Sequence, residues 1–262
     1  MKVRLSWVLA ALALALSLFL YQQTNVLQTT RYSWESPRVP RAFDGYRIVQ
    51  LSDLHNKRFG KHQRRLLRAV REAKPDLIAL TGDFVDLHTK SLAAATELLE
   101  GMQGLAPMLY VDGNHDPNSP YYQEFLALLD RYGVIVLDGV TQLLRGGETM
   151  TIAGYGYWEI QGPAIAPADI VLYHGPQWFP AFAAAGCGLV LAGHIHGGQI
   201  ALPGGRAIVG PAGTLFPEYS HGVYREGAST MVLSRGLGTS GAPLRLFSPP
   251  EIVVIELSRK AN

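Results

Sequence analysis

The residue types that can carry chemistry in this chain gather in five short stretches. Aspartate, asparagine and histidine occur together in "SDLH", "GDFVD", "GNHD", "YHGP" and "GHIH". The candidate residues are Asp53, His55, Asp83, Asp86, Asn114, His115, His174, His194 and His196. Carboxylate, amide and imidazole ligands without a thiolate suit divalent ions such as Mn, Fe, Zn, Co or Ni better than a sulfur-rich structural zinc site. The sequence therefore predicts a centre for divalent transition-metal ions.

Each of these residues, taken singly, also has an ordinary structural explanation. An aspartate at the end of a strand is more often a turn former or a helix cap than a metal ligand. The joint pattern argues against this explanation, because five of the eight histidines lie at successive predicted strand ends. We expect the other three, His62, His88 and His221, to be surface or structural residues.

The elements that must position these residues alternate between strands and helices in the first half of the chain. Residues 46–55, 76–83 and 107–116 are apolar runs that end in polar residues, and residues 61–73 and 91–102 have the apolar spacing of a helix face. This β-α-β-α-β order favours a parallel sheet. Because open α/β sheets bind ligands at the carboxyl ends of their strands, we expect the five stretches to converge in one crevice.

After residue 133 the chain changes to short strands with frequent turn signals. This rhythm predicts a second, more mixed sheet. Two sheets packed face to face with helices outside form a four-layer α/β/β/α sandwich, which is the fold that we expect. We assign residues 45–258 to this domain, residues 23–44 to an extended tether that contains prolines, and residues 1–22 to a membrane anchor.

The first twenty residues differ in composition from the rest. An uncharged apolar run covers residues 5–21, after Lys2 and Arg4. At a rise of ~1.5 Å per residue, such a helix nearly crosses a hydrocarbon layer of ~30 Å. Because no small-residue cleavage site follows, a single transmembrane helix is preferred to a cleaved signal peptide, and both are preferred to a buried soluble helix. We expect the catalytic domain on the outer, periplasmic or extracellular side.

Composition limits the partners of the predicted domain. Its 262 residues are enough for one large domain, and the formal net charge of the chain is only +2. No dense run of lysine and arginine is present, so nucleic acid is not an expected partner. Cys187 is the single cysteine, which excludes an intramolecular disulfide.

The complete motif series resembles the calcineurin-like metallophosphoesterase superfamily. The matching motifs are, in order, D-x-H, G-D-x-x-D, G-N-H-D, a later histidine and G-H-x-H. Any one of them is weak evidence, but the series from Asp53 to His196 is specific. The stretches "GHIHGGQI" and "SRGLGTSGAPLRLFSPPEI" are similar to a branch of often membrane-targeted bacterial phosphoesterases, which includes relatives of UDP-2,3-diacylglucosamine pyrophosphatase.

The resemblance implies a centre of two metal ions. By motif position, metal one takes Asp53, His55, Asp83 and His196, and metal two takes Asp83, Asn114, His174 and His194. Asp83 would then bridge the two ions. Two cations in such a centre acidify a shared water and clamp the attacking and leaving oxygens of a phosphoryl transfer. Neither a serine nor a cysteine nucleophile is required.

The resemblance also implies roles for residues outside the ligand set. His115 is similar to the family's catalytic histidine, which stabilises or protonates the leaving oxygen, and Asp86 is similar to the acid that orients it. The alternative for Asp86 is a cap on the next turn. Arg235 and Arg245 could bind substrate beside the glycine-rich loop 236–241, or they could be surface arginines on a turn.

These observations predict a phosphoesterase that hydrolyses a phosphodiester or pyrophosphate bond of a lipid-linked or membrane-proximal substrate, by attack of a metal-bound hydroxide. The protein phosphatases of the superfamily have arginine where this chain has Leu87, which disfavours a phosphoprotein substrate. A general phosphomonoesterase or phosphodiesterase acting on small soluble substrates is one alternative. A metal-dependent amidase and a non-catalytic scaffold are the others, but no ligand position of the motif series is missing.

Overall fold

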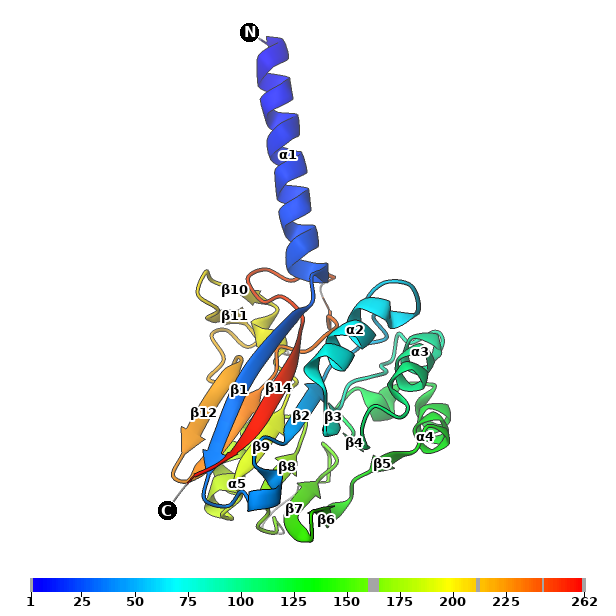
Figure 1. The fold of residues 1–262 in the computed structure, drawn as a ribbon. Helices are drawn as coiled ribbons and strands as arrows, with labels where there is room; N and C mark the ends of the chain where they lie inside the picture. The colour runs from blue at the N-terminus through cyan, green and yellow to red at the C-terminus, as the bar shows by residue number, and fades with distance from the viewer. Residues whose placement is uncertain (1, 160–164, 211–212, 242, 261–262) are drawn as a thin grey trace.

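A computed structural model describes residues 2–159, 165–210, 213–241 and 243–260. Two six-stranded sheets lie face to face, and one long helix, α1 (Lys2–Asn25), projects from one end of the domain (Figure 1). The first sheet has the order β1-β14-β2-β3-β4-β5 and the second has the order β12-β13-β9-β8-β7-β6.

The first sheet and the helices that cover it consist of β1 (Gln28–Ser36), β2 (Arg47–Leu51), β3 (Leu77–Thr81), β4 (Met108–Val111), β5 (Val134–Val136), β14 (Glu251–Arg259), α2 (Arg64–Ala73), α3 (Ala93–Met102) and α4 (Tyr122–Arg131). The second sheet and its helix consist of β6 (Gly139–Arg145), β7 (Glu148–Gly154), β8 (Ile170–Leu172), β9 (Leu189–Ala192), β12 (Gly222–Glu226), β13 (Ser229–Leu233) and α5 (Phe179–Ala184). A small hairpin, β10 (Ile200–Ala201) with β11 (Ala207–Val209), lies outside both sheets.

Among the described residues, three groups of buried side chains separate four layers. One group lies between the first sheet and helices α2 to α4, a second lies between the two sheets, and a third packs around α5. In α2, for example, Leu66 and Val70 are buried whereas Arg64 and Arg68 are exposed, so one face of the helix packs on the sheet. The predicted α/β/β/α sandwich is therefore confirmed.

The central strands of the first sheet have the predicted parallel arrangement. Strand β2 pairs in parallel with β3, and β3 pairs in parallel with β4. Nearly all their residues are buried, as expected for strands covered on both faces. The carboxyl ends of these strands consequently meet at one edge of the sheet.

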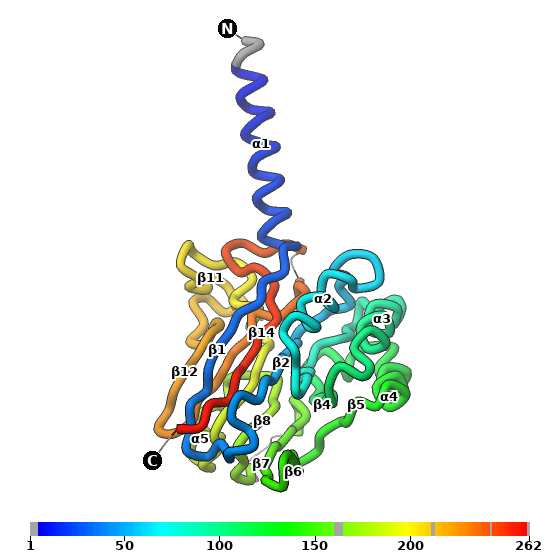
Figure 2. The backbone as a smooth tube through the Cα atoms, in the orientation of Figure 1, coloured from blue at the N-terminus to red at the C-terminus, as the bar shows by residue number. Residues whose placement is uncertain are grey.

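The segment that we expected to be a tether, residues 23–44, belongs instead to the folded domain. Strand β1 pairs in parallel with β14 from Gln28 to Ser36, and Trp34 and Phe43 are buried in the core between the sheets. The prolines that suggested a flexible linker follow the strand, where they cannot interrupt its hydrogen bonds. Only residues 26 and 27 separate α1 from β1, as the continuous trace in Figure 2 shows.

Candidate metal centre and active site

Two groups of side chains with metal-ligand chemistry lie at the carboxyl ends of strands from both sheets. The first group is Asp53, His55 and His196, and the second is Asp83, His174 and His194. Within each group, the ligand atoms lie within 4.8 Å of one another. These residues follow strands β2, β3, β8 and β9, so the two sheets jointly form the centre that the sequence predicted.

The Asp83 carboxylate lies between the two groups. Its Oδ2 atom is 3.0 Å from Nε2 of His174 and 3.7 Å from Nε2 of His55. Its Oδ1 atom accepts a hydrogen bond of 2.8 Å from the backbone amide of His115, which fixes the orientation of the carboxylate. Oδ2 is therefore presented to both groups at once.

Several buried atoms around Asp83 have ligand chemistry but no hydrogen-bond partner. They are Nε2 of His55, Oδ2 of Asp83, Oδ1 of Asn114 and Nε2 of His174. Buried polar atoms nearly always have partners, so four such atoms around one carboxylate fit the ligands of a cation better than a packing defect. The residues thus fit a centre of two divalent ions.

The ring orientations of two histidines support the same conclusion. Nδ1 of His55 lies 3.0 Å from Oδ2 of Asp86, and Nδ1 of His174 lies 2.7 Å from the carbonyl oxygen of Thr81. Both partners are acceptors, so each Nδ1 carries the proton of the neutral ring. Each Nε2 then presents a lone pair to the centre, as in metal-ligating histidines whose other nitrogen is hydrogen-bonded.

The electrostatics of the centre favour positive charge between its carboxylates. Burial alone would lower the pKa of His174, but the Asp83 carboxylate raises it to about 10. Burial alone would raise the pKa of Asp83, but His174 holds it well below its usual range. Burial, and then His174, lowers the pKa of His194 to about 3, so that ring is neutral. A bound cation would take the place of the His174 proton.

The backbone at the ligand positions is strained. Asp53, His55, Asp83, His194 and His196 all have φ between 45° and 76°, in the left-handed region. For residues other than glycine this conformation costs roughly 1–3 kcal/mol each, and such strain tends to cluster at functional sites. In this chain it turns each side chain inward directly after its strand.

Two glycines permit the close approach of the segments that carry the ligands. A Cβ atom at Gly193 would lie 2.0 Å from Oγ of Ser52 and 2.4 Å from Oδ2 of Asp53. The amide of Gly238 donates a hydrogen bond of 2.6 Å to the carbonyl oxygen of Asp53, and a Cβ there would lie 2.4 Å from the Leu54 carbonyl oxygen. The loop expected to meet a phosphate thus packs at this point against the ligand segment.

Asp86 contacts a different histidine from the one that we expected. Its carboxylate accepts a hydrogen bond from Nδ1 of His55, whereas His115 has its Nε2 atom 3.5 Å from Oγ of Ser240. The turn after β3 brings Asp86 to the His55 side of the centre, where the amide of His88 also binds it. The expectation that Asp86 orients His115 is therefore wrong.

Replacing Asp86 by asparagine should weaken metal binding more than it lowers turnover per bound metal. The hydrogen bond to His55 Nδ1 fixes the ring that presents Nε2, and losing such a contact typically lowers metal affinity ~10–100-fold. Titration of the metal-free protein with Mn²⁺ measures this, with the exposed carboxylate variant Asp130→Asn as control. Unchanged affinity with reduced turnover would contradict the assignment.

The two arginines expected to bind substrate, Arg235 and Arg245, contact other groups of the protein instead. Arg245 is fully buried, and its guanidinium donates hydrogen bonds to the carbonyl oxygens of Gly238, His196 and Ser248. Arg235 forms an ion pair with Glu251. Neither is among the described residues that line the cavity, so the expectation of substrate binding is not supported. Arg245 instead fixes the backbone around a ligand histidine.

Asp116 is a functional position that the sequence interpretation missed. It is fully buried, and its carboxylate accepts hydrogen bonds from the amides of Asp83, Phe84, Val85 and Gly113. It thereby ties the loop after β3 to the loop after β4. Burial, together with Asp83, raises its pKa to about 6. The sequence signal for this role was the position of Asp116 at the end of the "GNHD" motif.

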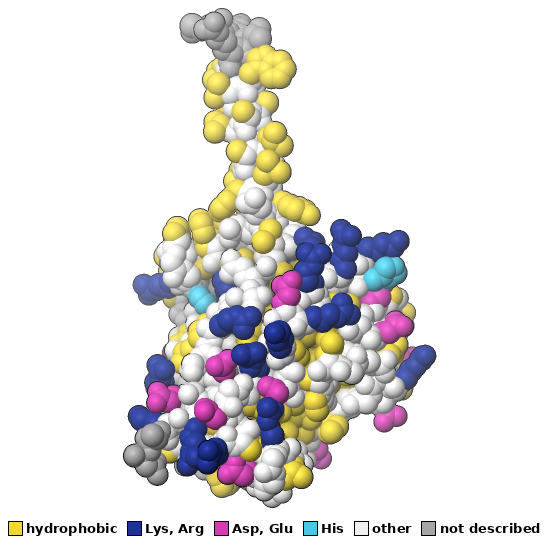
Figure 3. All heavy atoms as spheres, viewed as in Figure 1, with side chains coloured by type: hydrophobic (Ala, Val, Ile, Leu, Met, Phe, Trp, Pro, Cys, Tyr) yellow, Lys and Arg dark blue, Asp and Glu magenta, His cyan; other side chains and the backbone are white. Residues whose placement is uncertain are grey.

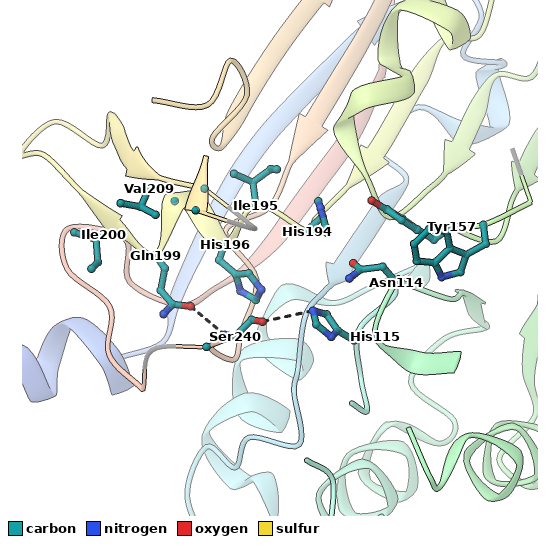
Figure 4. Close-up of a pocket in the computed structure, with 15 residues that line it drawn as sticks. Asn114, His115, Tyr157, His194, Ile195, His196, Gln199, Ile200, Val209 and Ser240 are labelled. Atoms are coloured by element: carbon teal, nitrogen blue, oxygen red, sulfur yellow. Dashed lines mark hydrogen bonds between the residues drawn. The ribbon is translucent and has the colours of Figure 1, made fainter. Parts of the chain in front are cut away.

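The centre opens into a cavity of about 600 Å³ (Figure 4). Its lining includes Asn114, His115, His194, His196, Tyr157, Trp158, Ile195, Gln199, Ile200, Val209 and Ser240. One wall therefore carries ligand and acid-base groups, and the opposite wall is formed largely by the hairpin β10–β11. Ser240 joins the two walls, because its hydroxyl lies near His115 and its amide donates to Oε1 of Gln199.

Comparisons with known proteins agree with this geometry. Residues 46–198 match the family described as calcineurin-like phosphoesterase. The chain is 31% identical over 253 residues to the uncharacterised metallophosphoesterase YkuE of Bacillus subtilis, which covers 90% of this chain and 87% of YkuE. It is 30% identical over 232 residues to phosphodiesterase YaeI of Escherichia coli, covering 81% and 82%.

A further relative carries a membrane description. The zebrafish "transmembrane protein with metallophosphoesterase domain" is 27% identical over 252 residues, which cover 85% of this chain and 55% of that protein.

Proposed function

Because the chain belongs to the calcineurin-like phosphoesterase family, we propose that this metal-dependent phosphoesterase hydrolyses a phosphodiester or pyrophosphate bond of a lipid-linked or membrane-proximal substrate. The observation that carries the hydrolytic part is the Asp83 Oδ2 atom, which is buried and faces histidines of both ligand groups. A phosphodiesterase named among the relatives supports the choice of bond.

The ligand groups define which residues would hold the two divalent ions that the family uses. Asp53, His55 and His196 would hold one ion, Asn114, His174 and His194 would hold the other, and Asp83 would be shared. When bound, such ions neutralise phosphate charge and lower the pKa of water. The ring of Tyr157 packs beside those of His174 and His194, with ring centroids 5.7 and 5.3 Å away.

His115 is positioned to protonate the leaving group. It follows Asn114 into the cavity, and its backbone amide is fixed by Asp83 while its ring faces Ser240. In the reaction, a water gives up one proton to solvent and its oxygen forms a new bond to phosphorus. The bond to the leaving oxygen breaks, and that oxygen takes the proton of His115. The Ser240 hydroxyl lies 3.5 Å from the Nε2 atom of this ring.

The apolar wall of the cavity supports a substrate that has an apolar portion. Ile195, between the ligand histidines His194 and His196, and Ile200 and Val209 of the hairpin line the cavity. Leu87 stands where the protein phosphatases of the superfamily have an arginine. Its side chain is 65% exposed and has no charge with which to bind a phosphoprotein. The relation to enzymes that cleave UDP-2,3-diacylglucosamine remains a prediction.

We expect acylation of a phosphodiester substrate to raise kcat/KM. Each methylene buried against the apolar wall contributes at most ~0.8 kcal/mol, or roughly fourfold in kcat/KM. The measurement compares a water-soluble aryl phosphodiester with its acylated form in mixed micelles, using the full chain and Mn²⁺, with an aryl phosphomonoester as reference. Equal kcat/KM for the two diesters would favour small soluble substrates instead.

The membrane part of the proposal depends on α1. Its residues from Leu5 to Asn25 form a helix long and apolar enough to cross a bilayer. Residues 5–18 are exposed, and only the last part of the helix contacts the domain. Leu12 and Leu16, for example, are 61% and 58% exposed, as expected for side chains that contact lipid. We propose a single-pass anchor with the catalytic domain on the outer side.

The full-length, unprocessed chain should remain with membranes after a carbonate wash. Leu12→Glu with Leu16→Glu should release it, because a charge at the centre of a spanning helix costs about 2.5–3.5 kcal/mol. The control is the pair Leu87→Glu and Leu144→Glu, which changes two exposed leucines of the domain. Recovery of the unprocessed wild-type chain in the supernatant would contradict the anchor.

A further inference from the structure

The end of α1 is fixed to the catalytic domain. Oε1 of Gln23 accepts a hydrogen bond of 3.0 Å from the amide of Phe247, and Oγ1 of Thr24 accepts one of 3.1 Å from the amide of Arg245. The rings of Phe19 and Phe247 lie 5.7 Å apart. If α1 spans a bilayer, one end of the domain must therefore face the membrane surface.

The hairpin β10–β11 lies at that end. The amide of Ala201 donates to the carbonyl oxygen of Leu246, and the amide of Leu246 donates to that of Gln199, so the hairpin is joined to the segment that binds α1. Figure 1 places both strands of the hairpin beside the foot of the helix. The hairpin is consequently next to any bilayer that α1 crosses.

Apolar side chains project from the hairpin region into solvent. Leu202, in the hairpin turn, is 43% exposed. Leu215 and Phe216, which pair with β11 through an isolated bridge and the Phe216 amide, are 65% and 54% exposed. Such residues in a contiguous group mark an interaction surface more often than an ordinary solvent-facing one.

Basic side chains flank the apolar group. Arg206 in the hairpin turn lies over the Phe216 ring at 5.4 Å. On the other side of α1, Lys61, Arg64 and Arg65 are exposed around the start of α2, where Figure 3 shows lysine and arginine side chains gathered near the helix foot. Apolar residues bordered by cations match the chemistry of an anionic lipid surface.

We propose that Leu202, Leu215 and Phe216, with Arg206, Lys61, Arg64 and Arg65, form a second membrane-binding surface that rests on an anionic phospholipid bilayer. The leucines and the phenylalanine enter the headgroup region, and the cations pair with lipid phosphates. This inference depends on the proposed membrane position of α1 and is independent of the reaction.

The surface has a direct consequence for substrate access. Ile200 and Val209 of the same hairpin line the cavity that contains the metal ligands. Contact of the hairpin with lipid therefore brings the cavity wall to the membrane interface. An amphiphilic phosphodiester could then reach the centre without leaving the headgroup layer completely.

Depth-dependent quenching tests the surface in the full-length chain. In a Cys187→Ala background, Leu215→Cys carries a bimane probe in vesicles of phosphatidylcholine and phosphatidylglycerol that contain headgroup-region spin-labelled lipid. The control is Leu144→Cys, because Leu144 is 74% exposed but belongs to β6, at the end of the domain opposite α1. We expect quenching at position 215 to exceed that at position 144 several-fold.

Equal quenching at the two positions, in vesicles that retain the protein, would overturn the surface while leaving the anchor and the reaction intact. A probe at position 215 that is shielded from water but not quenched by lipid would indicate a second copy of the chain and would also overturn it. Failure of the chain to float with vesicles would remove the anchor and this inference together.

The basic residues have a matched test of their own. Arg64→Gln with Arg65→Gln should lose most of the extra quenching that position 215 gains in anionic vesicles over purely zwitterionic ones. Arg131→Gln with Arg225→Gln removes the same charge from exposed sites on α4 and β12 and should preserve that difference. An equal loss in both pairs would show that net charge, rather than this surface, determines lipid preference.

Discussion

Asp83→Asn should abolish metal-dependent activity and remove most of the bound metal. The carboxylate presents Oδ2 to both ligand groups, so one substitution weakens both ion sites at once. Two-metal stabilisation is worth several kcal/mol of barrier, which corresponds to at least ~10³-fold in rate at 1.36 kcal/mol per factor of ten. Metal analysis after reconstitution, together with phosphodiesterase assays, measures both effects.

We expect the Asp83→Asn variant to fold, because asparagine retains an oxygen that can accept the hydrogen bond from the His115 amide. Circular dichroism and thermal unfolding of the metal-free variant check this. The control is Asp138→Asn, which removes an exposed carboxylate outside the centre. Full activity of Asp83→Asn, or activity that survives exhaustive chelation in the wild type, would refute a shared two-metal centre.

His115→Ala should lower kcat ~10²–10⁴-fold while the metal content stays near that of the wild type. The ring lies in the cavity wall but belongs to neither ligand group, and Asp83 binds its backbone amide rather than its side chain. Removal of the ring therefore affects the leaving group and spares the ligands. The effect should shrink for substrates whose leaving group is a good anion without protonation.

That dependence on the leaving group separates acid catalysis from a structural role. Matched aryl phosphodiesters with leaving-group phenols of different acidity provide the measurement, and His88→Ala, at an exposed histidine, is the control. A variant that loses its metals but keeps its turnover per bound metal would show that His115 is a ligand or a support for one.

The two groups of candidate metal ligands could be predicted from the sequence because each residue follows closely after a strand, where local sequence order fixes its place. Asp53 and His194 belong to different sheets, yet both follow apolar runs that could be recognised without knowing how the sheets pack. The same reasoning predicted the four layers. Strands alternate with helices before residue 133 and short strands follow after it, which indicates two different sheets.

The errors concern contacts that no local pattern encodes. The sequence allows Arg245 to bind substrate, but its guanidinium donates instead to carbonyl oxygens from three separated positions of the chain. Asp86 faces His55 rather than His115 because of the direction of one turn. Strand β1 was missed because its partner β14 is distant in sequence and its own residues alternate only weakly in burial.

The place of β14 has a consequence for how the protein is made. It lies between β1 and β2 in the first sheet, although it is synthesised after every other strand. Until β14 is synthesised, the edges of β1 and β2 that face it lack their partner strand, and such exposed edges can pair incorrectly with other strands. The first sheet can therefore close only when β14, the last strand among the described residues, inserts between β1 and β2.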